Sequence, residues 1–215
     1  MRAERLKEEG LLKAIERAIE EKKQKENKLQ SLRAWRTHLN LANLGFDDVW
    51  KRWYAGQVPP KLEVDLLCVF PDLGSASDEV LLIAVEVKHF DRSSKGNFFS
   101  GFDQVLAFSL FGFDGLSLWH LFSSDVGEGI IKGHSSGARE IVDRYNLPLF
   151  YLAAAVSDDL QDVHFSSYSP AETTGSVDYY VEWMWNHARD KRNPLLGSDE
   201  VRKRRRAIKA MLRIP

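Results

Sequence analysis

Two apolar runs joined by a short turn constrain the fold of this chain more than any other feature. Leu62 to Phe70 and Val80 to His89 are rich in aliphatic residues, and Pro71 to Asp78 between them holds Pro, Gly, Ser and Asp. Apolar runs bounded by turn residues are typical of strands. Glu86 and its neighbours stand at the end of a run that is otherwise apolar on both faces. We therefore predict an antiparallel hairpin within a larger sheet.

The rest of the chain alternates between helical and strand patterns, which favours a single α/β domain. The predicted helices cover residues 1 to about 44 with Gly45 at the end, 102–111, 138–145, 177–189 and 198 to about 213, and the further strands cover 48–54, 116–122 and 149–156. The predicted fold class is α/β, with a central mixed β-sheet flanked by helices and with N- and C-terminal helical extensions. The predicted divisions are a helical segment at 1–44, the core at 45–170 and C-terminal helices with a basic tail at 171–215.

Composition places the chain among ordinary globular proteins. Of its 215 residues 44% are hydrophobic and 28% charged, and the net charge is −1. The single cysteine, Cys68, excludes an intrachain disulfide and a cysteine-based zinc site, and its apolar surroundings predict a buried, inert thiol. The sequence shows no apolar run long enough to span a bilayer and no ordinary secretory signal. We expect no membrane association and a reducing, cytoplasmic location.

Charged residues interrupt the two apolar runs at one end of the predicted hairpin. Side chains alternate between the faces of a strand, so Glu63 and Asp65 share one face, as do Glu86 and Lys88. An antiparallel register brings these side chains onto a single patch. The register that does so pairs Asp65 with Glu86, Glu63 with Lys88, and Phe70 with Leu81.

Carboxylates gathered on one patch predict a metal site. They repel one another unless they are protonated or bridged by a cation, and oxygen ligands without thiolates suit Mg²⁺ or Mn²⁺. An ion between Asp65 and Glu86 would polarise a phosphodiester and activate water, and Lys88 would contact that water or the developing phosphorane charge. The alternative is a cross-strand salt bridge on a solvated sheet face.

Asp65 followed by Glu86-Val87-Lys88 after a hairpin resembles the active-site pattern of the PD-(D/E)XK nuclease superfamily. Val64 stands where that name has proline, and Glu63-Val64-Asp65 is similar to an acid-x-acid variant of the pattern. The resemblance implies a restriction-endonuclease-like core in which Asp65 and Glu86 bind Mg²⁺, with Mn²⁺ able to substitute. It also implies that the Val87 carbonyl and Glu63 are further metal ligands and that Lys88 assists the attacking water.

The resemblance extends to the predicted helix after the hairpin and to the N-terminal helix. Gln104-x-x-x-Phe108 is similar to the Gln-x-x-x-Tyr element of RecB-like members, although phenylalanine lacks the tyrosine hydroxyl. The resemblance implies a glutamate on the N-terminal helix, for which Glu26 is the candidate and Glu20 and Glu21 are alternatives. The implied function is Mg²⁺-dependent hydrolysis of nucleic acid, with DNA as the expected substrate and a homodimer or larger complex as the expected assembly.

Three further patterns leave alternatives open. The basic segment near the C-terminus predicts phosphate contacts, although a solvated helix face or a localisation signal has the same composition. The residues predicted to contact phosphate are Arg202, Arg204, Arg205, Arg206 and, in the loop after the hairpin, Lys95. Gly133 to Gly137 matches the nucleophile elbow of serine esterases, with Ser135 as nucleophile. A catalytically silent nuclease-fold protein that binds DNA or an assembly partner is the remaining alternative.

Overall fold

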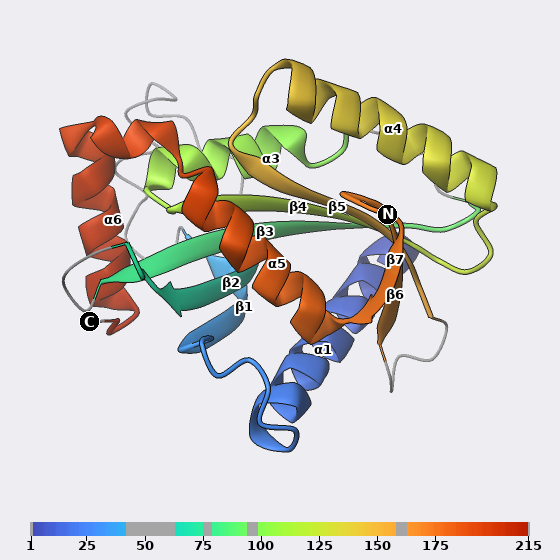
Figure 1. The fold of residues 1–215 in the computed structure, drawn as a ribbon, viewed down its shortest axis with the longest axis horizontal. Coiled ribbons are helices and arrows are strands. Elements are labelled where there is room, and N and C mark those ends of the chain that lie inside the picture. The colour runs from blue at the N-terminus through green and yellow to red at the C-terminus, as the bar shows by residue number, and fades with distance from the viewer. Residues whose placement is uncertain (1, 42–62, 75–78, 94–98, 158–162, 215) are drawn as a thin grey trace.

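A seven-stranded sheet forms the centre of the protein in the computed structural model (Figure 1), which describes residues 2–41, 63–74, 79–93, 99–157 and 163–214. Strands that follow one another in the chain also lie side by side in the sheet. They are β1 (Ala34–Asn40), β2 (Glu63–Pro71), β3 (Val80–Phe90), β4 (Gly115–Phe122), β5 (Leu149–Val156), β6 (His164–Ser169) and β7 (Thr173–Ser176).

The sheet is mixed, with a parallel centre and antiparallel margins. β1, β2 and β3 pair antiparallel, β3, β4 and β5 pair parallel, and β5, β6 and β7 pair antiparallel. Parallel neighbours need a crossover connection. The first crossover is α3 (Phe102–Phe108) with the 3-10 turn η2 (Ser109–Phe111), and the second is α4 (Glu128–Arg144). The crossovers explain why the central strands are apolar along nearly their whole length.

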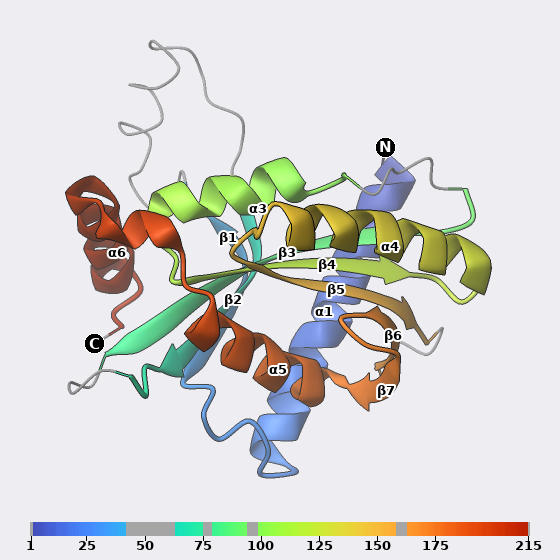
Figure 2. The ribbon, with the colours of Figure 1, turned by 45° about the horizontal axis from the view of Figure 1, so that its top comes forward.

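Helices cover both faces of the sheet and define two cores (Figure 2). α1 (Arg2–Gln24) and α5 (Val177–Asp190) pack on one face, and α3 and α4 pack on the other. The 3-10 turn η3 (Pro194–Gly197) leads to α6 (Asp199–Met211), whose Ile208 joins the second core. The predicted class is therefore confirmed: the protein is α/β, with a central mixed sheet flanked by helices and with helical N- and C-terminal extensions.

Alternation along β2 separates the two cores. Leu66 and Cys68 pack in the core beneath α1 and α5, whereas Leu67 and Val69 pack in the core beneath α3. Cys68 is fully buried, as predicted, and its burial raises the pKa of the thiol. A one-residue slip of this strand would exchange the two sets of side chains, so the packing fixes the register.

The prediction of a helix through residues 29–39 is wrong. α1 ends at Gln24, and a loop with positive φ at Asn27 and Leu29 leads into β1, which pairs with β2. The spacing of the apolar residues matched a helix because Leu29 and Leu32 in the loop and Trp35 in β1 all reach the core beneath α1 and α5, whereas Leu39 packs against the other core. The expected helix end at Gly45 and the expected strand at 48–54 lie outside the described residues.

The sheet also extends past both limits of the predicted core at 45–170. It begins with β1 and ends with β7, so the segments assigned to helical flanks contribute edge strands. The strands β6 and β7 are short and serine- or threonine-rich, which gave no apolar alternation to detect. Within the described ranges, no helix has the length and apolar character needed to cross a membrane.

Candidate metal-dependent active site

A pocket of about 450 Å³ opens where β2 begins and β3 ends, between the start of α1 and α3. Its walls come from both helices and from the first three strands, so residues from distant parts of the sequence meet there. The lining residues are Glu8, Glu9, Leu12, His38, Glu63, Asp65, Glu86, Lys88 and Gln104. Four predicted side chains from the hairpin and the predicted Gln104 are therefore gathered in one pocket.

The hairpin has the predicted register. Phe70 pairs with Leu81, and the ladder continues to Leu66 and Val85. One further step along the two strands places Asp65 beside Glu86. The Val87 backbone N–H donates to Asp65 Oδ2 at 2.7 Å, which ties the first acid to the strand that carries the second. Val87, whose carbonyl was predicted as a further metal ligand, is not among the described residues that line the pocket.

Glu63 has a different partner from the one that the register suggested. Its Oε1 lies 2.8 Å from Nδ1 of His38, and Lys88 contacts Glu86 instead. His38 has a positive φ of 52° in the middle of β1, and this irregularity accompanies its contact across to β2. His38 was not among the predicted site residues, since nothing in its sequence neighbourhood distinguishes it.

Glu86 is a buried acid with an incomplete set of partners. Its side chain is 1% exposed, and Oε1 lies 2.5 Å from Lys88 Nζ. Oε2 is buried without a hydrogen-bond partner among the described residues. Burial, followed by the repulsion from Asp65, raises the pKa of Glu86 to about 8. Burial likewise raises the pKa of Asp65, to about 6, against the stabilising N–H of Val87.

Lys88 keeps its charge in this setting. Burial acts to lower the pKa of its ammonium group, but the charge and hydrogen bonding of Glu86 outweigh burial, so the pKa is raised. Its side chain is 22% exposed, so the ammonium group reaches the pocket while its stem is covered. The site therefore presents one fixed positive charge beside two carboxyl groups.

A tight turn at Gly101 packs against the acidic side chain of Glu86 and the basic side chain of Lys88. Gly101 has φ 83°, and a Cβ atom there would lie 2.8 Å from Leu118 Cδ1 and within 3.3 Å of the Cγ atoms of Glu86 and Lys88. The preceding Ser100 carbonyl accepts a hydrogen bond of 2.8 Å from Nε2 of a buried histidine, His120. The absence of a side chain at Gly101 lets the turn pack directly on the site.

This turn opens α3 and so positions Gln104. Gln104 lines the pocket in the first turn of the helix, while Val105 and Phe108 face the core. Phe108 is fully buried, with its ring 6.0 Å from that of Phe113. A hydroxyl would have no role at position 108, which explains how phenylalanine fits there.

The structure does not bring Glu26 to the site. Glu26 lies just beyond α1, is exposed, and pairs with Lys22 at 2.6 Å and Lys28 at 3.1 Å. The helix places Glu8 and Glu9 in the pocket instead, and the charge of Glu8 raises the pKa of both Asp65 and Glu86. The sequence held a usable signal, since Glu8 precedes the buried Leu12 by four residues and so lies on the inward stripe of α1.

This difference gives a direct comparison of the two helix glutamates. We expect Glu8→Gln to weaken binding of Mn²⁺ about tenfold, because residues around a metal site tune its affinity by that order. Glu26→Gln is expected to leave the affinity unchanged. Isothermal titration of Mn²⁺ into the three proteins measures both effects, and equal affinities for Glu8→Gln and wild type would remove Glu8 from the site.

The basic segment at the C-terminus is partly committed to holding α6 in place. Arg204 donates to the Leu110 carbonyl at 2.7 Å, and Arg205 pairs with Asp114. Arg202 pairs with Asp199 on the same helix, and Arg206 is exposed. Arg204 and Arg205 are therefore fixed by contacts to the protein itself. Lys95 lies outside the described residues.

The predicted nucleophile elbow is absent from its expected place. Gly133 to Gly137 lies within α4 rather than at a strand-to-helix turn. Ser135 is 4% exposed, and its Oγ donates to the Lys132 carbonyl one turn earlier, at 3.1 Å. Gly133 and Gly137 suggested a turn, but both lie inside α4 at positions that are not buried. The strand-to-helix turn that the esterase alternative requires is therefore not present at this segment.

The acidic side chains of the pocket fit a cation such as Mg²⁺, which keeps several water ligands, better than a cation whose ligands all come from the protein. Among the described residues, no group of three or more His, Cys, Asp or Glu side chains is placed to hold a metal ion. Mg²⁺ is usually held by one or two carboxylates and completes its shell with water and substrate oxygens. The buried Asp65 and Glu86 match that requirement, because Oε2 of Glu86 has no hydrogen-bond partner within the described ranges.

Comparisons with family models, curated proteins and solved structures gave no match to this chain. Its fold and site define it as an α/β protein with a pocket that holds two buried acids, Asp65 and Glu86, beside Lys88.

Proposed function

We propose that the protein is a Mg²⁺-dependent nuclease that hydrolyses phosphodiester bonds, with the active-site plan of the PD-(D/E)XK superfamily. The observation that carries this proposal is the buried Glu86 oxygen Oε2, which has no hydrogen-bond partner in the described part of the chain, near Asp65 and the charge of Lys88. Two buried carboxyl groups and a lysine in one pocket are costly to fold, and a divalent cation bound by both carboxylates would offset that cost.

The acids and the lysine take distinct roles in this proposal. Asp65 and Glu86 would hold Mg²⁺, which when bound polarises the phosphodiester and lowers the pKa of a bound water. The N–H of Val87 keeps Asp65 oriented through the bond to Oδ2. Lys88 donates to the attacking water or to the phosphoryl oxygen on which charge develops. Gln104 borders the same space and orients the substrate.

The charge of the pocket separates a nuclease from a protein that only binds nucleic acid. Five carboxylic acids line the pocket against a single lysine: Glu8, Glu9, Glu63, Asp65 and Glu86. This surface repels a phosphodiester unless cations neutralise it. A pure binding protein gains nothing from such a surface, whereas a metal-dependent enzyme needs it. DNA as the substrate, and assembly into a dimer, rest on the resemblance of the motif.

A cleavage panel tests the proposed function. Labelled linear, single-stranded and branched DNAs, and an RNA, are incubated with wild type and Glu86→Gln in Mg²⁺ or in EDTA. We expect cleavage of at least one DNA by wild type in Mg²⁺, none in EDTA, and a loss of about a hundredfold or more in Glu86→Gln. Glu140→Gln, an exposed change on α4, is the matched control and retains activity. Cleavage that persists in Glu86→Gln would refute the proposed site.

A further inference from the structure

A second cavity lies at the opposite end of β3 from the acidic pocket. It has a volume of about 320 Å³ and is formed by the start of β3, the residue before β4, the segment after α5, and α6. It is lined by Glu79, Asp114, Arg192, Leu196, Arg202, Arg205 and Arg206. Four guanidinium groups thus share one cavity with two carboxyl groups.

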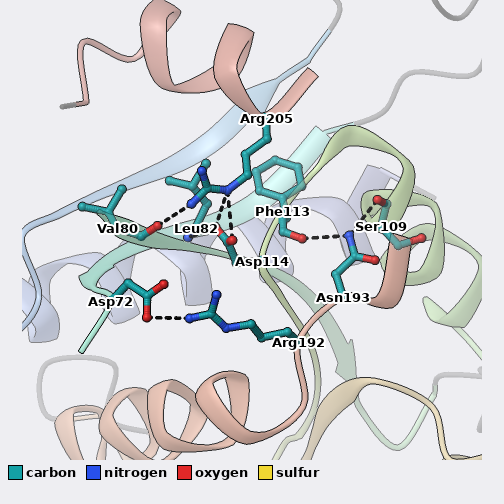
Figure 3. A network of polar contacts seen from close by, with 9 residues as sticks. All are labelled: Asp72, Val80, Leu82, Ser109, Phe113, Asp114, Arg192, Asn193 and Arg205. Carbon is teal, nitrogen blue, oxygen red and sulfur yellow. Dashed lines mark hydrogen bonds and ion pairs between the residues drawn. The ribbon is translucent and has the colours of Figure 1, made fainter. Parts of the chain in front are cut away.

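Arg205 is fixed inside this cavity by its own contacts (Figure 3). Its Nε donates to both oxygens of Asp114, at 2.9 and 3.1 Å, and Nη2 donates to the Val80 carbonyl at 2.7 Å. Asp114 is anchored in turn by the Leu82 N–H at 2.8 Å. A guanidinium has five N–H donors. The bonds of Arg205 to described residues leave Nη1 for a ligand while they hold its plane still.

Arg192 is held in a similar way on the other side of Asp114. Its Nη2 lies 2.5 Å from Asp72 Oδ1, and the Asp72 side chain is 2% exposed. The next residue, Asn193, anchors the chain by donating to the carbonyls of Ser109 at 2.8 Å and Phe113 at 2.9 Å (Figure 3). The guanidinium of Arg192 is therefore presented to the cavity by a segment that is itself tied to the protein.

Fastening α6 explains Arg205 but not the two arginines beside it. Arg202 and Arg206 are four residues apart on α6 and so lie on one face of the helix. Arg202 forms an exposed pair with Asp199, and such pairs contribute little to stability. Among the residues that line the cavity, four guanidinium groups stand against the carboxylates of Glu79 and Asp114, an excess of positive charge that a bound anion would balance. Asp72 and Asp199 pair with Arg192 and Arg202 from outside the lining.

We propose that this cavity is an oxyanion site that takes a phosphate group. Guanidinium groups bind phosphate through paired, charge-assisted hydrogen bonds, and two of the four here are already oriented by buried carboxylates. Prior orientation lowers the entropic cost of binding. The site is separate from the acidic pocket and needs no metal. The same chemistry is offered by free phosphate, by a terminal phosphate of a nucleic acid and by its backbone.

Titration of inorganic phosphate into the full chain tests the site, in EDTA and at constant chloride. We expect saturable binding of one phosphate per chain by wild type, and a loss of affinity of about tenfold in Arg206→Gln and in Arg202→Gln. Neither arginine anchors α6 to the sheet, so both variants keep the fold. Lys203→Gln removes the same charge from the same helix outside the cavity and is expected to bind like wild type.

The proposal is overturned if wild type shows no saturable binding, or if Lys203→Gln weakens binding as much as the arginine variants do. The source of the phosphate follows from competition. An oligonucleotide that displaces phosphate only when it carries a 5′-phosphate identifies a terminal group, and displacement regardless of the 5′ end identifies the backbone. Because the titration uses EDTA and no cleavage readout, its outcome is independent of the proposed nuclease activity.

Discussion

Replacing Lys88 by methionine is expected to lower the rate of Mg²⁺-dependent cleavage by about a hundredfold to a thousandfold, while metal binding is retained. The ammonium group is the one positive side chain of the acidic pocket that lies against Glu86, at 2.5 Å. Removal of a preoriented donor to developing negative charge has an effect of this order. Methionine keeps the length of the covered stem, so the packing under Gly101 is preserved. Single-turnover cleavage measures the rate, and Mn²⁺ titration measures the affinity.

A second substitution distinguishes charge from geometry at this position. Lys88→Arg keeps the positive charge but replaces a compact ammonium by a planar group, and we expect it to recover only a small part of the lost rate. Lys25→Met, at an exposed lysine just beyond α1 that pairs with Glu21 away from the pocket, controls for loss of a surface charge. Loss of Mn²⁺ binding together with cleavage in Lys88→Met would assign the lysine a structural role instead.

The hairpin and its acids were predictable because strand alternation and turn residues are local signals. Asp65 and Glu86 stand at the ends of two apolar runs, and the observed antiparallel register, with Leu66 paired to Val85, sets them beside each other on one face. Gln104 was predicted from the resemblance of Gln104-x-x-x-Phe108 to the Gln-x-x-x-Tyr element of RecB-like nucleases. These inferences need only the pattern within about 40 residues, and the structure places all three side chains in one pocket.

The features that escaped prediction depend on contacts between distant segments. β1 was mistaken for helix because Trp35 packs from a strand against the same core that Leu29 and Leu32 reach from the loop, which reproduces a helical spacing without a helix. Glu8 joins the site because α1 crosses the sheet at an angle that its own sequence does not contain. Arg192 meets Arg205 only after the chain has folded around α5 and α6. Tertiary arrangement decides each of these placements. Periodicity puts Glu8 on the inward side of α1 but does not say which part of the sheet that side meets.

Metal-free protein is expected to lose stability as pH rises from about 5 to about 8, and Glu86→Gln is expected to remove much of that loss. The pKa of Glu86 is raised from 4.5 to about 8 by burial and by Asp65, so the folded state binds its proton more tightly than the unfolded state. Stability is therefore greatest below pH 4.5 for this group and declines until pH passes 8. At about 1.4 kcal/mol per pKa unit, the difference amounts to a few kcal/mol. Urea unfolding in EDTA at pH 5 and 8 measures it.

The comparison must separate Glu86 from the buried histidines, which act in the opposite direction. Burial lowers the pKa of His120 to about 3 and of His134 to about 4, so both destabilise the fold as pH falls below 6.5. These contributions are common to wild type and variant, and subtraction of the two curves cancels them. Mg²⁺ should stabilise wild type more at pH 8 than at pH 5, because its ligands must be deprotonated, and should stabilise Glu86→Gln little at either pH. Parallel curves for the two metal-free proteins would show that the pKa of Glu86 is not raised in the folded state, and equal stabilisation of both proteins by Mg²⁺ would remove the case for a cation at this site.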